Sequence, residues 1–564
     1  LSNFYGRMTA RLIRMGVIML VIYAGLLAVT QHLLVSTPTG LVPQLDRSYL
    51  IAAMQLPAGS TLERSDALVR KASEIILSRP GVANAVSFVG FDGATFTNAP
   101  NTGVIFVTLK PFKERPGITK DMILADLRGQ MFALREAFVF VLEPPSVPGI
   151  GTGGGLKGYV DGSLHAEGVD LQRIAAEVGT PVYVYSSATI ERHYKLFEAA
   201  MKTTAPAGKA HVFYAMKANG NLGVLKTLGA LGAGIDTVSE GEVRKALAAG
   251  IPPEKIVFSG VGKSEQELRF AVEAGLYQVN IESESELDLL SKVASQLGKR
   301  QEAVFRVNPD IGAGGHAKIT TGSSENKFGV SFEEVGRLYS RAANMPGVRI
   351  MGLAVHIGSQ IREIDAFEAA YTKMVALLGD LRAEGHRVDR LDLGGGLGIP
   401  YDIPKTFDYG PGLIEAYAEM VAKVTKGLDV ELGFEPGRLI VGNAGILLTR
   451  VLHLNPRPTK QFLVVDAAMN DLVRPAMYEA YHEIWPVAEP AIGGPELAYD
   501  VVGPICESGD TFTTGRQLPQ LRQNDLVAFM TAGAYGASMS STYNQRLLVA
   551  EVMVKGDQYA VTRP

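Results

Sequence analysis

The hydrophobic positions of the chain change their spacing several times, and each change predicts a different kind of structure. Residues 15–29 form an unbroken apolar run, which continues after three polar residues as far as residue 35. A transmembrane helix needs about 20 largely apolar residues, so residues 15–35 are predicted to span the inner membrane. Arg7, Arg11 and Arg14 precede the run, which predicts an N-terminus that faces the cytoplasm. A buried helix of a globular core is the alternative.

Residues 36–155 show the spacing of both strands and helices. Residues 48–55 and 103–109 have the length and apolar character of strands. Residues 65–78 have the three-to-four spacing of an amphipathic helix. This part of the chain is therefore predicted to be an α+β segment.

Three stretches of this first part are LVPQLDRSYLIAAMQLPAGSTLERSD, NTGVIFVTLKPFKER and PPSVPGIGTGGG. They resemble the efflux transporters of the resistance-nodulation-division family, over residues 1 to about 155. The resemblance implies one transmembrane helix followed by the start of a porter domain. The proton relay of such transporters uses charged residues in other spans, and the sequence has no second apolar run of that length. A membrane efflux transporter component is therefore only the alternative function of another class.

From residue 211 onwards, short apolar runs alternate with stretches of helical spacing. Eight runs are predicted to be strands: 211–216, 234–238, 255–258, 277–281, 302–307, 349–355, 390–393 and 429–434. Strands that alternate with helices pair in parallel, and eight such units predict a closed (β/α)8 barrel, here over residues 189–436. An open doubly wound sheet is the structural alternative. Residues 437–564 read as strands with short links and are predicted to form a β-sheet domain together with residues 156–188.

Composition and charge narrow the possible functions. Hydrophobic residues make up 47% and charged residues 20% of the 564 residues, as in ordinary globular proteins. The net charge of −4 gives no reason to expect nucleic acid as a partner. Cys506 is the one cysteine, so no disulfide can form within the chain. The nine histidines show no metal-ligand spacing, and we expect no metal site.

Reactive groups in a (β/α)8 barrel lie at the C-terminal ends of the strands. Here Lys217 follows the first strand, the glycines 394–396 follow the seventh, and Glu435 ends the eighth, just before Gly437 and Arg438. Glycines let backbone N–H groups approach a phosphate, and a lysine amine can bond covalently to an aldehyde. With a carboxylate for the pyridine nitrogen, the combination indicates pyridoxal 5'-phosphate. Taken singly, each residue could be an ordinary loop residue.

Further stretches follow one another in the order GTPVYVYS, FYAMKAN, HAKITTGSSENKFG, HIGSQ, LDLGGGLGIPY, EPGR, DAAMNDLVRPAMYEAYH, GPICESGD and GAYGASMSSTYN. From about Tyr159 to the end, the chain resembles the bacterial diaminopimelate decarboxylases, in the alanine-racemase-like (fold type III) group of pyridoxal enzymes. The resemblance implies decarboxylation of meso-2,6-diaminopimelate to L-lysine, the last step of lysine biosynthesis, by a homodimer. A related decarboxylase acting on ornithine, arginine or another diamino acid is the alternative.

The resemblance also implies roles for single residues. Lys217 would carry the cofactor and take part in proton transfer, His356 would stack on the cofactor ring, and Glu435 would pair with the pyridine nitrogen. The other implied ligands are Ser359, Gly394, Gly395, Gly396, Gly437, Arg438 and Tyr535 for the cofactor, and Arg438, Arg474, Tyr478, Glu507 and Tyr535 for the substrate. Catalytic Cys506, together with Glu507, would reach into the active site of the partner subunit. His356 and Cys506 could instead be structural, and Arg474 and Tyr478 could simply share a helix face.

The two resemblances conflict in their topology. A single span that starts inside places all that follows outside the membrane, whereas the second part resembles an enzyme with a cytoplasmic cofactor. We therefore expect a fusion of two unrelated segments near residues 155–158. The enzyme region is predicted to be cytoplasmic, with membrane association only through residues 15–35.

Overall fold

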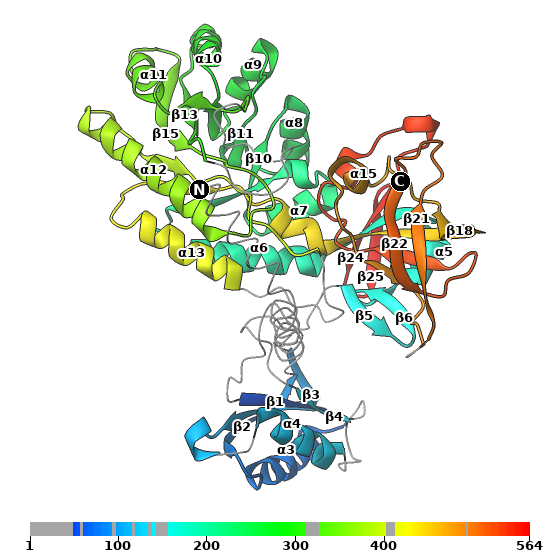
Figure 1. Ribbon diagram of the computed structural model, residues 1–564. Coiled ribbons are helices and arrows are strands. Elements are labelled where there is room, and N and C mark those ends of the chain that lie inside the picture. The colour runs from blue at the N-terminus through cyan, green and yellow to red at the C-terminus, as the bar shows by residue number, and fades with distance from the viewer. Residues whose placement is uncertain are drawn as a thin grey trace, which may run out of the picture. The chain divides into compact units, whose positions relative to one another are not determined.

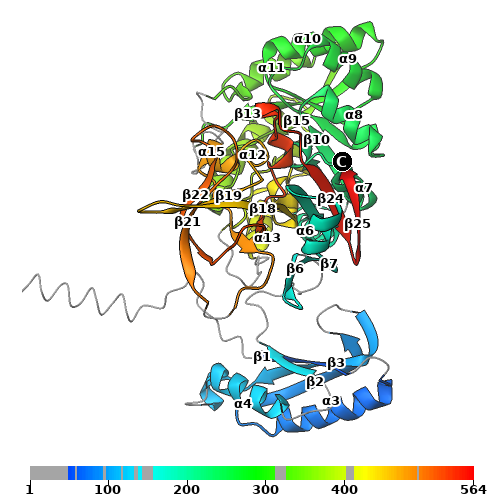
Figure 2. The ribbon, with the colours of Figure 1, turned by 90° about the vertical axis from the view of Figure 1, so that its right-hand side faces the viewer.

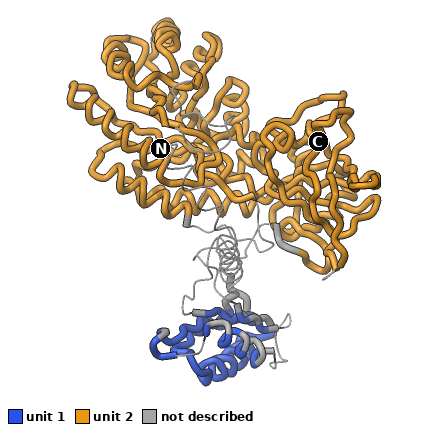
Figure 3. The backbone as a smooth tube through the Cα atoms, viewed as in Figure 1, with its two compact units in different colours: residues 1–93, 97–146 blue, residues 94–96, 147–564 orange. Residues whose placement is uncertain are grey.

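The computed structural model describes residues 49–56, 60–92, 97–115, 119–132, 138–142, 156–206, 208–311, 326–401, 412–491 and 494–564. The chain divides into two compact units, one of residues 1–93 with 97–146 and one of residues 94–96 with 147–564 (Figure 3). Among the helices of the described stretches, none is both long and apolar enough to cross a bilayer. The predicted span at residues 15–35 lies outside those stretches.

The first unit is a four-stranded antiparallel sheet with two helices on one face (Figure 2). Its elements are β1 (Tyr49–Gln55), α3 (Leu62–Leu77), β2 (Val82–Asp92), β3 (Thr97–Leu109), α4 (Lys120–Phe132) and β4 (Phe138–Leu142). The strand order β2-β3-β1-β4 makes this a ferredoxin-like arrangement. Helix α3 begins where the Thr61 side chain accepts a hydrogen bond from the N–H of Arg64, and it buries Leu68, Val69 and Ala72. The predicted α+β segment is confirmed.

The second unit contains the predicted barrel (Figure 1). Its strands are β9 (Ala210–Ala215), β10 (Gly234–Thr237), β11 (Ile256–Phe258), β12 (Gln278–Ile281), β13 (Gln301–Asn308), β15 (Val348–Ala354), β16 (Arg390–Asp392) and β17 (Glu431–Phe434). All neighbours pair in parallel, and the pairings β17–β9 and β12–β13 close the ring. The closure confirms the (β/α)8 barrel and excludes the open sheet. The short β14 (Val330–Ser331) pairs with β13 outside the ring.

Helices connect successive strands and cover the outside of the barrel (Figure 1). They are α6 (Ser187–Met201), α7 (Leu222–Ala230), α8 (Glu240–Ala248), α9 (Glu265–Ala274), α10 (Glu284–Gln296), α11 (Val335–Ala342), α12 (Ile364–Ala383) and α13 (Gly412–Val424). The side chains of Ser239, Ser264 and Ser283 cap the N-termini of α8, α9 and α10, each by accepting the N–H three residues later. These helices therefore start close to the strand ends, which fixes the loops of the barrel mouth.

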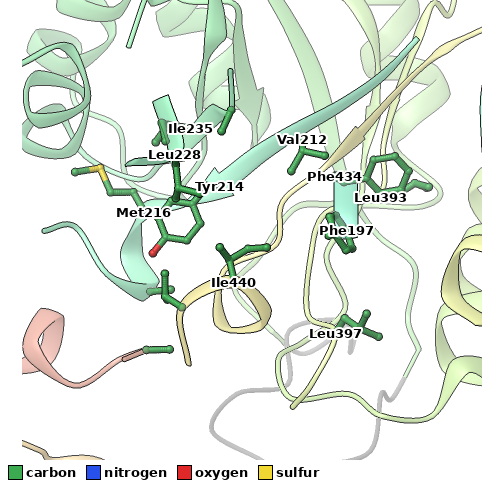
Figure 4. Close-up of a cluster of buried hydrophobic side chains, with 14 of the residues drawn as sticks. Phe197, Val212, Tyr214, Met216, Leu228, Ile235, Leu393, Leu397, Phe434 and Ile440 are labelled. Carbon is green, nitrogen blue, oxygen red and sulfur yellow. The ribbon is translucent and has the colours of Figure 1, made fainter. Parts of the chain in front are cut away.

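The core of this unit lies between the strands and their helices. Figure 4 shows Phe197 of α6, Val212 and Tyr214 of β9, Leu228 of α7 and Ile235 of β10 in one cluster of buried side chains. Strands buried on both faces read as continuous apolar runs instead of alternating ones. This is why a strand such as β11, Ile256-Val257-Phe258, stands out in the sequence as a short unbroken run.

A second sheet in this unit joins residues from both sides of the barrel. Its strands are β8 (Val182–Ser186), β18 (Gly445–Pro456), β19 (Gln461–Val465), β20 (Ile484–Pro486), β21 (Glu496–Val502), β22 (Thr511–Pro519), β23 (Leu526–Phe529), β24 (Ala550–Lys555) and β25 (Gln558–Arg563). Strand β8 lies between β18 and β24, so the chain entering the barrel pairs with the chain leaving it. Before β8 come α5 (Leu171–Glu177) and a small sheet of β5 (Leu156–Val160), β6 (Ser163–Ala166) and β7 (Val169–Asp170). The fold-type-III arrangement of barrel plus β-sheet domain is confirmed.

Buried hydrogen bonds join the second sheet to the barrel mouth. Asn219, just after β9, donates from Nδ2 to the carbonyl of Gly533 at 2.9 Å. The N–H of Tyr535 donates to the carbonyl of Ala218 at 2.8 Å. The end of β9 is therefore held directly against the segment 533–535 of the second sheet region.

Candidate active site

A cavity of about 560 Å³ opens at the C-terminal ends of the barrel strands. This volume is in the range of small-molecule sites. The predicted site residues that line it are Lys217, His356, Ser359, Gly396, Glu435, Gly437, Arg438, Arg474, Tyr478 and Tyr535. Gly394 and Gly395 immediately precede Gly396 in the same loop. Residues from the barrel and from the second sheet region thus meet in one cavity.

Lys217 lies in a single turn directly after β9, with its side chain 38% exposed towards the cavity. Its Nζ is 3.6 Å from Oδ2 of the fully buried Asp236. Burial by itself would lower the pKa of the amine, but the acidic groups around it, Asp236 first and also Tyr535 and Glu435, raise the pKa above its ordinary value. The amine is therefore a cation at neutral pH.

Asp236 at the end of β10 is part of a buried hydrogen-bonded chain. Ser259 donates to its Oδ1 at 2.7 Å, and Asn280 donates from Nδ2 to Ser259 Oγ at 3.0 Å and to Glu435 Oε1 at 3.5 Å. The other oxygen, Oδ2, accepts no hydrogen bond from the described residues. An orphaned carboxylate oxygen beside Lys217 indicates a position where a further donor would be favourable.

Glu435 directly follows β17 and is 8% exposed. Burial, together with the charges of Asp236 and Asp392, raises the pKa of Glu435 well above its ordinary value, although Lys217 and Arg306 oppose the change. A protonated ring nitrogen beside this buried carboxyl group would stabilise its carboxylate form. The site therefore fits a pyridine ring at this position.

The three glycines after β16 could not be replaced without moving the backbone. Gly394 and Gly396 have φ of +64° and +111°. A Cβ on Gly395 would lie 2.0 Å from the carbonyl oxygen of Glu435, and one on Gly396 2.3 Å from that of Gly358. The loop is thus packed directly on the ends of β15 and β17, as a close backbone cradle for an anion requires.

His356, just after β15, accepts a hydrogen bond at Nδ1 from the N–H of Gly395 at 3.3 Å. Burial, and then the positive charges of Lys217 and Arg306, hold the pKa of His356 well below its ordinary value. The imidazole is therefore neutral and carries its proton on Nε2. A neutral ring in the cavity wall suits stacking on another aromatic ring.

Two buried guanidinium groups face the cavity. Arg438 begins α14 (Arg438–Val441) and donates to Ser359 Oγ at 3.1 Å and to the Tyr401 hydroxyl. Arg474 begins α15 (Arg474–Tyr478) and lies over the Tyr401 ring, with its guanidinium carbon 4.4 Å from the ring centre. Among the described residues, no carboxylate forms an ion pair with either of them. Buried cations without a carboxylate partner favour an anionic ligand.

His482 sets the orientation of Arg474. The Nδ1 of His482 donates to the Met530 carbonyl at 2.8 Å, so Nε2 is free to accept from Nη1 of Arg474 at 2.7 Å. Burial, and then the charge of Arg474, lower the pKa of His482 to about 3. The histidine is therefore a neutral acceptor that holds one N–H of the guanidinium and leaves the others for a ligand.

Cys506 and Glu507 are not brought to this cavity. Both lie in the exposed loop between β21 and β22. The N–H of Cys506 contacts Oδ1 of Asn544 at 3.5 Å, and a hydrogen bond to Glu507 raises the pKa of Tyr543. Neither residue lines the cavity of its own chain.

Asn280, Tyr401 and His482 were not among the site residues predicted from the sequence. Asn280 could have been noticed, because it is a polar residue inside the apolar run of β12 and is 2% exposed. Tyr401 and His482 carry no local signal, since only the packing of distant segments makes them partners of Arg438 and Arg474.

Two family models match the chain. The model described as "Pyridoxal-dependent decarboxylase, pyridoxal binding domain" matches residues 187–442, and the model of the AcrB/AcrD/AcrF family matches residues 1–179. Both resemblances predicted from the sequence are confirmed. The match to the AcrB/AcrD/AcrF family extends to residue 179, beyond the predicted boundary at residue 155.

Full-length relatives match as well. The diaminopimelate decarboxylase of Zymomonas mobilis is 46% identical over 405 residues, which cover 72% of this chain and 94% of that protein. The diaminopimelate decarboxylase of Pseudomonas aeruginosa is 47% identical over 401 residues, with 71% and 94% covered. Among solved structures, the diaminopimelate decarboxylase of Helicobacter pylori complexed with L-lysine is 36% identical, with a TM-score of 0.65 and 70% and 96% of the two chains covered.

Proposed function

The chain belongs to the diaminopimelate decarboxylase family, and from that premise we propose that it removes one carboxyl group of meso-2,6-diaminopimelate as carbon dioxide and leaves L-lysine. The cofactor is pyridoxal 5'-phosphate, and the reaction is the last step of lysine biosynthesis. One observation carries the proposal. An amine at the end of β9, a carboxyl group at the end of β17 and two buried arginines, which pair with no carboxylate of the described residues, meet in one cavity.

Pyridoxal phosphate supplies an electron-accepting ring that stabilises the negative charge left on carbon when carbon dioxide departs. Lys217 would hold it covalently, His356 would lie against the ring, and Glu435 would share a proton with the ring nitrogen through a carboxylate oxygen. The groups proposed to hold the phosphate are Ser359, Gly394, Gly395, Gly396 and Tyr535, and Gly437 and Arg438 would also contact the cofactor. The packing of the glycine loop on β15 and β17 supports this assignment.

Lys217 also has a role in proton transfer. The carboxylate of Asp236, 3.6 Å away, favours the ammonium form at Nζ. An ammonium group in the cavity wall can deliver its proton to the carbon that has lost its carboxyl group. Cofactor attachment and proton delivery thus use the same nitrogen at different times.

Arg438, Arg474 and Tyr478 would bind the carboxylates of the substrate. Paired hydrogen bonds from a guanidinium to a carboxylate contribute about 1.5–3 kcal/mol each. Meso-diaminopimelate carries a second amino-acid head, which ornithine and lysine lack. A buried arginine left without a partner would therefore disfavour these simpler diamino acids.

We propose that the active enzyme is a homodimer in which Cys506 and Glu507 enter the cavity of the partner subunit. Their side chains are exposed, yet their loop is anchored by buried Asp510, which accepts the N–H groups of Met469 and Ile505, both at 2.6 Å. When inactive Cys506→Ala and Lys217→Ala chains are mixed, activity should partly return. Absence of any recovery would contradict shared sites.

The organisation of the chain is also a proposal. We infer a barrel over residues 189–436, a β-sheet domain of residues 156–188 with 437–564, and a fused transporter-like segment over residues 1–155. The enzyme region acts in the cytoplasm, and membrane association is through residues 15–35. A chain of residues 156–564 should release carbon dioxide as fast as the full chain, and should leave the membrane fraction. Loss of activity would show that the first segment is needed.

The full chain, supplied with pyridoxal phosphate and meso-diaminopimelate, should release carbon dioxide and form L-lysine in equal amounts. The Lys217→Ala chain is the matched control and should release none. Faster turnover of ornithine than of meso-diaminopimelate would replace the proposed substrate, and no carbon dioxide from any diamino acid would overturn the proposed function.

A further inference from the structure

Glu282 lies behind the cavity wall and accepts hydrogen bonds from three segments of the barrel mouth. It follows β12 directly, and its side chain is 1% exposed. Its Oε1 accepts from Arg306 Nη1 at 3.0 Å and from the N–H of Gly260 at 2.9 Å, and its Oε2 accepts from the N–H of Gly329 at 3.1 Å. The donors come from the ends of β11 and β13 and from the segment before β14. Burying a carboxylate is costly unless donors satisfy its oxygens, and these three donors do so for Glu282.

Two of the three partners of Glu282, Gly260 and Arg306, line the cavity, whereas Glu282 does not. Phe328, the neighbour of the third partner Gly329, is also part of the lining. The guanidinium carbon of Arg306 lies 4.9 Å from the centre of the Phe328 ring, so Arg306 is held from both sides. Any influence of Glu282 on a ligand must therefore pass through these neighbours.

Gly329 is placed for this contact by its missing side chain. Its φ is +73°, and a Cβ there would lie 2.8 Å from the carbonyl oxygen of Arg306. Only a glycine lets the segment approach β13 closely enough for its N–H to reach Glu282. The hydrogen bond from Gly329 to Glu282 thus holds Phe328, one residue earlier, beside Arg306 in the cavity wall.

We propose that Glu282 is a positioning residue of the decarboxylase site, which holds Arg306 in the wall and ties the loops at Gly260 and Gly329 to it; this inference rests on the proposed function. Arg438 and Arg474, which would bind the substrate carboxylates, have no bond to Glu282 among the described residues. The charge of Arg306 acts on Lys217, His356 and Glu435, so Glu282 serves the part of the cavity near the proposed cofactor position, and we expect little effect of it on substrate affinity.

The test is a double-mutant cycle of Glu282→Gln and Arg306→Gln in the full chain. Glu282→Gln should lower kcat for meso-diaminopimelate by about 10- to 100-fold, because small misplacements of active-site groups have effects of this size. KM should change by less than about threefold, since the substrate arginines are untouched. The affinity of the cofactor-free chain for pyridoxal phosphate, read by absorbance, should fall about tenfold, which corresponds to one charged hydrogen bond.

If Glu282 acts through Arg306, the double variant should be no worse than Arg306→Gln alone, in kcat and in cofactor affinity. Additive losses, or a rise in KM in place of a fall in kcat, would overturn the proposal. Glu284→Gln is the matched control, because Glu284 lies two residues further on and pairs with exposed Arg337 and Arg341. The Glu284→Gln variant should change neither kcat nor the affinity for pyridoxal phosphate.

Two measurements keep the result interpretable. Thermal unfolding of each variant separates a folding defect from a positioning effect, and losses that merely follow the unfolded fraction would overturn the proposal. The cofactor titration needs no substrate. If the wild-type chain fails to act on meso-diaminopimelate, the proposed function falls, while the coupling between Glu282 and Arg306 can still be read from cofactor affinity.

Discussion

Replacing Arg474 with lysine tests how the cavity recognises a carboxylate. The side chain is buried, one N–H is held by His482 at 2.7 Å, and the ring of Tyr401 supports its face. The remaining N–H groups can form two parallel bonds to a carboxylate, whereas an ammonium group forms only one at this geometry. Losing one charged bond of about 1.5–3 kcal/mol should lower kcat/KM for meso-diaminopimelate by roughly 10- to 150-fold.

The loss should fall on KM more than on kcat, because the carboxylate is held equally before and during the reaction. Initial rates of carbon dioxide release over a range of substrate concentrations give both constants. Arg516→Lys is the matched control, since Arg516 also lies over a tyrosine ring, that of Tyr481 at 4.2 Å, but already has a carboxylate partner in Glu483. A folded Arg474→Lys chain with kcat/KM within about threefold of wild type, or equal losses in both variants, would refute the reasoning.

Three further predictions address the cofactor site and a buried histidine. Borohydride reduction should fix pyridoxal phosphate on Lys217 in the wild type and on no residue in Lys217→Ala, as read by mass spectrometry; an adduct on another lysine would show that the cofactor is carried elsewhere. Gly395→Ala should lose cofactor binding, because its Cβ would lie 2.0 Å from a carbonyl oxygen, whereas Gly379→Ala in α12 meets nothing within 4 Å and should bind normally; equal titrations would disprove the packing argument. His482 has a pKa of about 3 in the folded chain and about 6.5 in the unfolded chain, so below pH 6.5 it takes up a proton on unfolding. The free energy of unfolding should therefore be unaffected by this group above pH 6.5 and should fall by about 1.4 kcal/mol per pH unit below it. Between pH 6 and pH 4, the free energy of unfolding by urea should depend less steeply on pH in His482→Gln than in the wild type. An equal pH dependence in the two chains would contradict the low pKa of His482.

The barrel could be predicted from the sequence because its strands are buried on both sides. An apolar run such as residues 255–258 is favoured as a strand when helices of matching length lie before and after it. All eight runs coincide with observed strands to within two residues. The closure of the ring, through β17 with β9, is a long-range pairing that the count of eight implied.

The cavity was predictable only where a residue carries a local signal. Lys217 breaks an apolar run, and the glycine loop and Glu435 follow strands directly. Glu282 also follows a strand, yet its role depends on Arg306 and Gly329, which are 24 and 47 residues away in sequence. Such partners are set by the closure of the barrel, and no local pattern contains them.

The charges of the cavity divide by the part of the chain that supplies them. Asp236 and Glu435, which face Lys217, come from the ends of barrel strands. Arg438 and Arg474 come from the helices that follow the barrel. Acid groups near the amine suit a cationic ring and a proton donor, and cations at the other side suit the carboxylates of a substrate. We infer that the barrel carries the chemistry of the cofactor and that the chain leaving it selects the substrate. Substitutions of Asp236 and Glu435 should change kcat and cofactor binding, and substitution of Arg474 should change KM. Arg438 would contact both ligands, so its substitution should change all three quantities.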